Sequence, residues 1–279
     1  MHDQPLPPPS RELSRRLMRV DIAYTVSRMR VIEARPGNPL GVEVRHFDGV
    51  VALMARRLPS MNFNRVVGLK AGDEPLIEPL ARWYRDNAVA VRFELAPGDH
   101  SPELGRALAE HGYFQSGFQV SLYGAPRSEK VSVPDIAVQP VHTEAAMDRF
   151  LEAYIAGWKL TEPVHANVQN DFRPWRHQQG WHLFVGLADG QAAAAAILYL
   201  HDGIGYFADA TTNPKFRGRG LQAALLRARS AFAHANAAEL VFGQAEFGSA
   251  SHRNMERVGL RALHTRALWT QLEPNGAAR

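Results

Sequence analysis

A glycine-rich segment between a strand pattern and a helix pattern limits the possible folds of this chain more than any other part of the sequence. Residues 211–222 read Thr-Thr-Asn-Pro-Lys-Phe-Arg-Gly-Arg-Gly-Leu-Gln. Gly218 and Gly220 allow positive φ angles and a close approach of the backbone to a ligand. The first turn of the following helix offers unpaired N–H groups and the positive end of the helix dipole, and Arg217 and Arg219 add charge. The segment therefore predicts a site for an anionic phosphate group.

Strand and helix patterns alternate through the second half of the sequence. Apolar residues recur at i, i+3, i+4, i+7, i+8 and i+11 from Met147 to Trp158, which predicts an amphipathic helix. Asp189 and Gly190 separate two apolar runs and predict a hairpin turn. The second run contains five alanines, 192–196, which also fit a helix, although the hairpin context favours a strand. We expect further strands over 136–140, 182–187, 204–212, 239–245 and 261–270, and helices from Leu221 onward and over 251–258.

The first half of the sequence gives shorter patterns. The helix expected over 11–29 either packs on the domain or lies on a membrane surface, and its narrow apolar stripe favours packing. That stripe consists of Leu13, Leu17, Val20 and Tyr24. Residues 124–135 mix Pro, Gly, Ser and charge and are the expected linker. We expect strands over 41–45, 64–69, 89–95 and 118–123, and helices that end near Asp86 and cover 101–111.

The glycine-rich loop and the order of elements around it resemble the GCN5-related N-acetyltransferase (GNAT) superfamily. The family loop reads Gln/Arg-x-x-Gly-x-Gly/Ala, and Lys215 stands at its first position here. The resemblance covers about residues 136–270. It implies that the loop wraps the pyrophosphate of acetyl-CoA and that backbone groups of the preceding strand bind the pantetheine arm. The residues implied in acetyl-CoA binding are Ala210, Thr211, Thr212, Arg217, Gly218, Arg219, Gly220, Leu221, Gln222 and Asn254.

The two halves of the chain are faintly similar to each other. Asn87–Phe93 aligns with Asn236–Phe242, and a short helix and a glycine, Gly112 or Gly259, follow in each half. The first-half counterpart of the loop, 68–73, lacks the Arg-Gly-x-Gly pattern. We therefore predict a mixed α/β (α+β) protein with two tandem acyl-CoA N-acyltransferase-like domains. The expected divisions are a Pro-rich tail and helix over 1–30, a degenerate GNAT-like domain over 31–126 and an acetyl-CoA-binding domain over 127–279.

Three polar groups near the loop are candidate catalytic residues, and the two acids among them, Asp209 and Glu246, are the candidates for the base that deprotonates an amine. Tyr206 and Asp209 lie on the strand that precedes the loop, and Glu246 ends the next strand. Strict alternation would place Tyr206 and Asp209 on opposite faces of their strand. For each acid, a surface or salt-bridge role is the competing interpretation.

The family often has a tyrosine that protonates the leaving thiolate, four residues before a Gly-Phe pair. Met255 stands at that position here, before Gly259 and Leu260. Because a thiolate leaves readily, loss of the general acid costs about 10²–10³-fold and does not exclude catalysis. A catalytically silent acyl-CoA-binding protein is therefore an alternative. In the same segment, Ser251 is the expected helix cap.

The acceptor side of such a fold is built from the first helix and the loop after it. Tyr154, Trp158 and Glu162 lie there, near His165 and Trp175. Aromatic rings together with an acid suit a cationic amine. The alternative is that Tyr154 and Trp158 simply continue the core stripe of the helix.

The composition limits the remaining functional classes. There is no cysteine, and the histidines lack metal-binding spacing, so we expect no metal. The net charge of +4 suits an anionic ligand but does not indicate nucleic acid. No apolar run approaches the roughly 20 residues that span a bilayer, and the N-terminus lacks the apolar core of a signal peptide. We expect a cytoplasmic protein.

These observations together predict an acetyl-CoA-dependent N-acetyltransferase that acts on a primary amine of a small molecule. Acetylation of protein N-termini or lysines is an alternative, as is an acyl-CoA sensor without catalysis. No nucleic-acid or membrane partner is expected, and a homodimer is left open.

Overall fold

The computed structural model describes residues 6–58, 60–128, 133–162 and 164–271. The chain forms two compact units, and neither is a continuous stretch of sequence. The N unit comprises Ser10–Gln119 together with the segment from His264 onward. The C unit comprises Val120–Leu263 together with the first nine residues.

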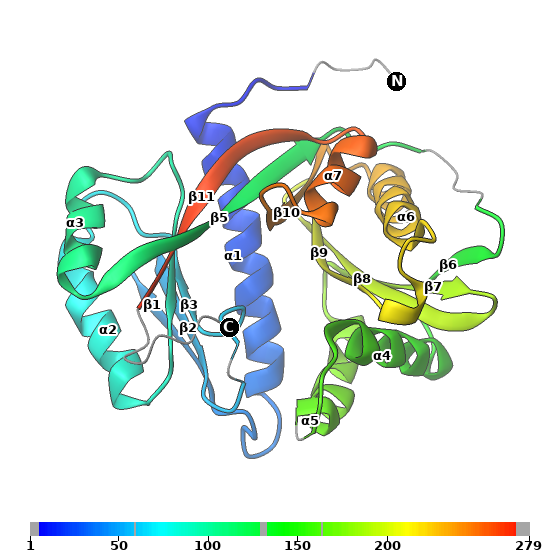
Figure 1. Ribbon diagram of the computed structural model, residues 1–279, viewed down its shortest axis with the longest axis horizontal. Coiled ribbons are helices and arrows are strands. Elements are labelled where there is room, and N and C mark those ends of the chain that lie inside the picture. Colours follow the sequence, from blue (N-terminus) through cyan, green and yellow to red (C-terminus); the bar gives the residue numbers. More distant parts are fainter. Residues whose placement is uncertain (1–5, 59, 129–132, 163, 272–279) are drawn as a thin grey trace. The chain divides into compact units, whose positions relative to one another are not determined.

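The N unit places three helices around a sheet (Figure 1). Its strands follow the order β1-β2-β3-β4-β11-β5. The pairs β1–β2 and β2–β3 are antiparallel, whereas β3 and β4 are parallel. The elements are α1 (Arg11–Glu33), β1 (Val42–Phe47), β2 (Val50–Ala55), β3 (Arg65–Val67), α2 (Ile77–Asp86), β4 (Arg92–Leu95), α3 (Pro102–Glu110) and β5 (Tyr113–Gly124).

Helix α1 packs on the N unit, which confirms the docked alternative over a membrane-surface helix. The predicted apolar stripe is buried, and so are the polar residues Asp21, Thr25 and Arg28 on the same helix. Strand β2 was not expected from the sequence. All six of its residues are buried and apolar, so they show no period-two alternation that would reveal a strand.

A buried group of charged side chains lies between α1 and the sheet of the N unit. The Glu94 carboxylate lies 3.1 Å from the nearest Arg65 nitrogen and 2.9 Å from Arg266, and Arg92 also contacts it. Asp21 of α1 lies 2.8 Å from Arg266. Burial alone raises the pKa of Glu94, but the three arginines outweigh burial and hold that pKa well below its usual range. This unit therefore depends on an ionic cluster as well as on apolar packing.

The C unit has its sheet in the order β5-β10-β9-β8-β7-β6. Helix α4 covers one face of this sheet and α6 covers the other (Figure 1). The run of five alanines lies in β8, as the hairpin context predicts. The elements are β6 (Ile136–Pro140), α4 (Glu144–Trp158), α5 (Val164–Asp171), β7 (Trp181–Ala188), β8 (Gln191–His201), β9 (Ile204–Thr212), α6 (Leu221–Ala235), β10 (Leu240–Glu246), α7 (Ala250–Arg257) and β11 (Arg261–Gln271).

Two long strands pass from one unit into the other. Strand β5 begins in the N unit and enters the C unit at Val120. Strand β11 runs the opposite way and enters the N unit at His264, where Ala267–Trp269 pairs with β4. Each half of the sequence thus contributes a strand segment to the unit built mainly from the other half. For this reason, the predicted chain divisions and the compact units do not coincide.

Candidate functional site

The glycine-rich loop joins β9 to α6 in the C unit, as the sequence predicts. Pro214–Phe216 forms a single 3₁₀ turn, and the Asn213 side chain accepts a hydrogen bond from the Lys215 backbone at 3.1 Å. Gly218 and Gly220 have φ angles of +79° and +88°. A Cβ atom at either glycine would meet nothing within 4 Å, so the conformation itself, not crowding, requires glycine here.

The start of α6 leaves backbone donors available. The helix begins directly after Gly220 without a side-chain cap. The N–H groups of Gly218, Arg219 and Gly220 reach no acceptor in the described part of the chain. Four N–H groups at a helix start lack intrahelical partners, and the dipole makes that end attractive to anions. The loop and the helix start therefore have the donors that a pyrophosphate requires.

The polar side chains of the loop contact the strands beside it. The Gln222 side chain donates to Thr212 Oγ1 at 2.8 Å, and Arg217 lies 3.5 Å from the Thr212 carbonyl. Arg219 forms two hydrogen bonds with Asp189 of the β7–β8 turn, at 2.7 and 3.1 Å. This hydrogen bonding lowers the pKa of Asp189. The Arg219–Asp189 pair is exposed, so exchange of Asp189 for a phosphate costs little.

Strands β9 and β10 diverge next to the loop. Their parallel pairing runs from Ile204↔Leu240 to Phe207↔Gly243. Strand β9 continues to Thr212 and β10 to Glu246, without further pairs between them in the described structure. Ala210, Thr211 and Thr212 lie in the diverging part of β9, where their edge toward β10 is available to an extended ligand.

A β-bulge shapes this part of β9. The pairing with β8 shifts between Ala195↔Thr211 and Ile197↔Ala208, so two residues of β9 oppose one of β8. Asp209 lies in the bulge with a φ of +39°. The prediction of strict alternation through Asp209 is therefore wrong, because a bulge inserts a residue and rotates the side chains that follow it.

The fully buried side chain of Arg229 supports the bulge. It extends from α6, and its Nη1 donates to the Ile197 and Ala208 carbonyls at 2.9 and 3.3 Å, the cross-strand pair that borders the register shift. Its guanidinium also lies over the Phe207 ring at 4.8 Å. Burial lowers the pKa of Arg229 to about 9, so it stays charged at neutral pH. The sequence patterns did not identify Arg229 as a buried residue. Its position four residues after Leu225, on the apolar face of α6, could have indicated burial.

Helix α4 approaches β9 so closely that only glycine fits at position 157. A Cβ there would lie 2.3 Å from Thr211 Oγ1 and 2.9 Å from Thr211 Cβ. Alanine normally stabilises a helix by about 1 kcal/mol relative to glycine, but here we expect Gly157→Ala to destabilise the protein by roughly 1–3 kcal/mol. Thermal unfolding measures this change. The double variant with Thr211→Ala should recover part of the loss.

A helix glycine with more room is the matched control for that substitution. At Gly105 of α3, a Cβ would meet only the end of the His100 side chain at 3.2 Å and Trp269 at 3.8 Å. Gly105→Ala should leave Tm unchanged or slightly raised. If Gly157→Ala behaves in the same way, the close contact between α4 and Thr211 is not present in solution.

Comparison with solved structures finds a similar fold in GCN5-related N-acetyltransferases. A GCN5-related N-acetyltransferase from Kribbella flavida has a TM-score of 0.65 at 16% sequence identity, over 94% of this chain and 95% of that chain. A tandem GNAT protein from the clavulanic acid biosynthesis pathway has a TM-score of 0.57 at 11% identity, over 82% of this chain and 79% of that chain. The chain has a tandem GNAT fold.

A third solved GNAT structure has the same fold. It is a GCN5-related N-acetyltransferase from Sphaerobacter thermophilus, with a TM-score of 0.58 and 15% identity, and 80% of each chain is covered. Neither family models nor curated proteins give a significant sequence match. At such low sequence identities, structural similarity shows the fold alone. The chemistry depends on the residues of this chain.

Met255, at the position where the motif resemblance predicts a tyrosine, lies in α7. Its side chain is buried, and a Cβ built at Gly243 of β10 would lie 3.0 Å from its Sδ and Cε. Met255 thus packs beside β10 and has no proton to donate. Asn254, on the same helix, accepts a hydrogen bond from Arg257 at 3.0 Å. The cap of α7 is Ser249 and not Ser251, because Ser249 precedes the helix and its side chain accepts from the His252 backbone.

The three candidate catalytic residues lie in different surroundings. The Tyr206 hydroxyl donates to Gln244 at 3.0 Å, and its ring stacks on Phe242. Asp209 is half-buried in the bulge, and Glu246 is exposed at the end of β10. Glu246 is thus at the open end of the diverging strands, whereas the Tyr206 ring lies in their paired part.

Tyr154 belongs to an aromatic cluster in the C unit. Its ring contacts Phe172 at 5.7 Å and Trp175 at 6.4 Å, and it is only 6% exposed. This burial agrees with the core alternative for Tyr154. Trp158 is 43% exposed, and the exposed Glu162 contacts His165 at 3.3 Å, so these side chains remain candidates for an acceptor site.

A cavity of about 580 Å³ lies along α4 and α5 on another face of α4. Its lining includes Asp148, Glu152, Lys159 and Arg173, and not Tyr154 or Trp158. Arg173 already pairs with Asp148 at 2.6 Å. Across the described ranges, no group of three acidic or histidine side chains is placed to hold a metal ion. Among the same residues, no helix has the length and apolar character needed to cross a membrane.

Proposed function

We propose that this protein is an N-acetyltransferase that uses acetyl-CoA and transfers the acetyl group in its C unit. Two neighbouring features support this proposal. The parallel strands β9 and β10 diverge, and backbone N–H groups at the start of α6 have no acceptor in the described structure. The backbone N–H groups at a glycine-containing helix start can bind a pyrophosphate. An unpaired strand edge can form hydrogen bonds with the amide groups of a pantetheine arm. The acceptor that we propose is a primary amine of a small molecule.

Positioning is the main contribution of the C unit to the proposed reaction. The amine must be neutral and must lie next to the thioester carbonyl. Holding the two reactants side by side converts a bimolecular reaction into an effectively unimolecular one. A backbone N–H of the diverging part of β9 would stabilise the oxyanion. Asp209 and Glu246 are the candidate bases, and Glu246 is the more accessible to an amine in solution. Arg219 and Arg217 would neutralise phosphate charge.

Met255 supports a second candidate function, an acyl-CoA-binding protein without catalysis. The buried methionine beside β10 supplies no acid for the thiolate. The two functions differ in one observable, the release of free CoA thiol. Saturable acetyl-CoA binding without thiol release, across panels of small amines and of peptides with free N-termini or lysines, would favour the silent protein. Release with peptides alone would identify a protein acetyltransferase.

Thermal unfolding with and without acetyl-CoA tests the central proposal. At 100 times its Kd, acetyl-CoA should stabilise the wild type by about 2.7 kcal/mol and raise Tm by several degrees. Gly220→Glu should abolish the shift, because it places a carboxylate where the phosphates would bind and strains a backbone with φ of +88°.

Gly37 provides the matched control for that substitution. It also has a positive φ, +75°, and open space around its Cβ direction, but it lies outside the loop. Gly37→Glu should carry similar backbone strain and keep the acetyl-CoA shift. A folded wild-type protein that shows no shift at saturating acetyl-CoA would contradict the proposal.

Asp209→Asn and Glu246→Gln then test the choice of base. The variant that removes the base should lower kcat by about 10²–10⁴-fold, keep the acetyl-CoA shift and lose the acidic limb of the pH–rate profile, along which the base becomes deprotonated. Equal activity of both variants and the wild type would exclude both acids.

A further inference from the structure

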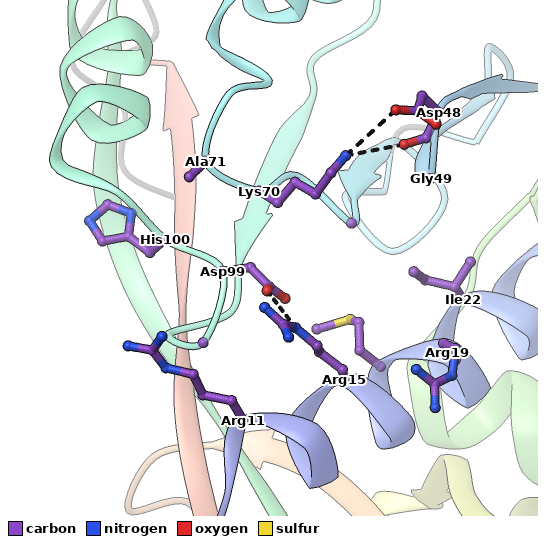
Figure 2. A pocket seen from close by; sticks show the side chains of 13 residues that line it. Arg11, Arg15, Arg19, Ile22, Asp48, Gly49, Lys70, Ala71, Asp99 and His100 are labelled. Atoms are coloured by element: carbon purple, nitrogen blue, oxygen red, sulfur yellow. Dashed lines mark hydrogen bonds and ion pairs between the residues drawn. The ribbon is translucent and has the colours of Figure 1, made fainter.

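The N unit contains a cavity of about 570 Å³, which we call the α1 pocket (Figure 2). One wall is the part of α1 from Arg11 to Ile22, and the opposite wall consists of the loops that follow β3 and β4 and the turn between β1 and β2. The parallel pair β3–β4 ends beside this pocket. Ligands of α/β proteins commonly bind outside the carboxyl ends of parallel strands. The pocket therefore has a location suited to a ligand.

Most of the charged side chains that line the α1 pocket are basic. Arg11, Arg15 and Arg19 follow each other at intervals of four residues on one face of α1, and Lys70 faces them from the loop after β3 (Figure 2). The carboxylates of the lining are Asp48 and Asp99. Four permanent cations thus face two carboxylates within the lining, and two more carboxylates, Asp73 and Glu12, contact Lys70 and Arg19 from beside it.

The ion pairs of these cations are weak enough to be exchanged. Arg15 pairs with Asp99 at 2.9 Å, and its side chain is 50% exposed. Lys70 pairs with Asp73 at 3.2 Å and is 48% exposed, and Arg19 lies 3.5 Å from Glu12. Arg11 has no ion pair within the described residues. Exposed pairs of this kind contribute little, so a multiply charged anion can replace them.

The loop after β3 differs from the glycine-rich loop of the C unit. The Lys70 N–H donates to Asp73 at 2.9 Å, and the Ala71 N–H donates to the Asp99 carbonyl at 3.0 Å. These backbone donors are already used, whereas those at the start of α6 are available. An anion beside Lys70 and Ala71 must therefore be held by side chains.

We propose that the α1 pocket binds an organic phosphate with a diphosphate group, of about nucleotide size. Three arginines extend over about 12 Å of helix, which suits several negative charges in a row better than a single anion. The planar guanidinium pairs with phosphate oxygens through two hydrogen bonds, and arginine predominates over lysine in this lining. The volume exceeds that of a free phosphate and lies in the usual range for small-molecule sites.

Glycine and apolar side chains leave room for the rest of the ligand. The stem of Arg11 packs over Gly98, where a Cβ would lie 3.6 Å from Arg11 Cγ. Met18 and Ile22 of α1 add apolar side chains to the lining beside the arginines. These features suit the sugar and base of a nucleotide next to its charged end.

Calorimetric titration of the full-length Gly220→Glu variant tests this proposal separately from the proposed function. That substitution disables the loop in the C unit and leaves the α1 pocket intact, so a failure of one proposal does not imply a failure of the other. The ligands are ADP, CoA, inorganic pyrophosphate and citrate. ADP or CoA should bind saturably, pyrophosphate more weakly, and citrate weakest. Binding of ADP but not of CoA would identify a free nucleotide as the ligand. Binding of CoA but not of ADP would identify a second CoA site.

Arginine variants in the same background locate the binding. Arg11→Gln and Arg15→Gln should each weaken binding by roughly tenfold, because each removes a charge-assisted contact. Arg30→Gln is the matched control, since Arg30 is an exposed arginine of α1 that pairs with Glu33 outside the pocket. The proposal is overturned if no phosphate ligand binds saturably, if citrate binds as tightly as ADP, or if the pocket variants behave like Arg30→Gln.

Discussion

Replacing Glu94 with glutamine should lower the free energy of unfolding by about 3–5 kcal/mol, a fall in Tm of roughly 6–20 °C. Glutamine keeps the shape of the side chain but removes the charge that compensates Arg65, Arg92 and Arg266. Two of these arginines, Arg65 and Arg266, have almost no exposed side-chain area, so the loss leaves buried positive charges without compensation. Thermal unfolding measures the change.

Glu78 offers a matched control for the Glu94 substitution. It also pairs with arginines, Arg82 at 2.9 Å and Arg85 at 3.4 Å, but on the exposed face of α2. Glu78→Gln should leave Tm close to the wild-type value. Equal Tm values for the two variants would show that the buried cluster does not stabilise the N unit.

The same cluster makes the N unit sensitive to acid. The pKa values of Glu94 and Asp21 are lowered in the folded protein, so the unfolded chain binds their protons first. The two carboxylates contribute fully to the stability of the fold above about pH 4, which is about the pKa of such carboxyl groups in the unfolded chain. That contribution is lost as the pH falls below this value. Burial lowers the pKa of His264 to about 4, which also favours the unfolded chain below about pH 6.5. The fall in Tm between pH 5 and 3 should therefore be shallower in Glu94→Gln than in the wild type.

Replacing Arg229 with alanine should destabilise the C unit by about 3–5 kcal/mol. The change removes a long buried side chain and leaves the Ile197 and Ala208 carbonyls without their donor. Arg229→Met keeps most of the volume and should cost less, about 1–3 kcal/mol, because only the hydrogen bonds are lost. Thermal unfolding of both variants separates the packing contribution from the polar one.

Arg229 should also affect ligand binding through the bulge of β9. If its guanidinium fixes the bulge, Arg229→Met should reduce the rise in Tm caused by acetyl-CoA, since Ala210–Thr212 lies directly after the bulge. The half-buried Arg227 of the same helix is the control, and Arg227→Met should keep that rise. A wild-type response in Arg229→Met would show that the bulge holds its shape without the arginine.

Local sequence patterns were sufficient for most elements of the C unit. Asp189-Gly190 defined the hairpin, and the glycine-rich loop defined the strand-to-helix junction, because turn chemistry acts over a few residues. The burial of Arg229 in α6 was not predicted, because the carbonyls that hold its guanidinium inside the core belong to β8 and β9 and not to its own helix.

Sequence patterns were enough to predict the tandem GNAT architecture, the glycine-rich loop between a strand and a helix, and a methionine where the resemblance predicts a tyrosine. These features depend on glycine, on periodicity and on residue identity, which can be read locally. The bulge at Asp209, the exchange of β5 and β11, the buried cluster around Glu94 and the α1 pocket became apparent only in the folded protein. Each of these arises from residues far apart in the chain. Their pairing energy depends on the burial and geometry that the complete fold creates, and no short stretch of sequence carries that information.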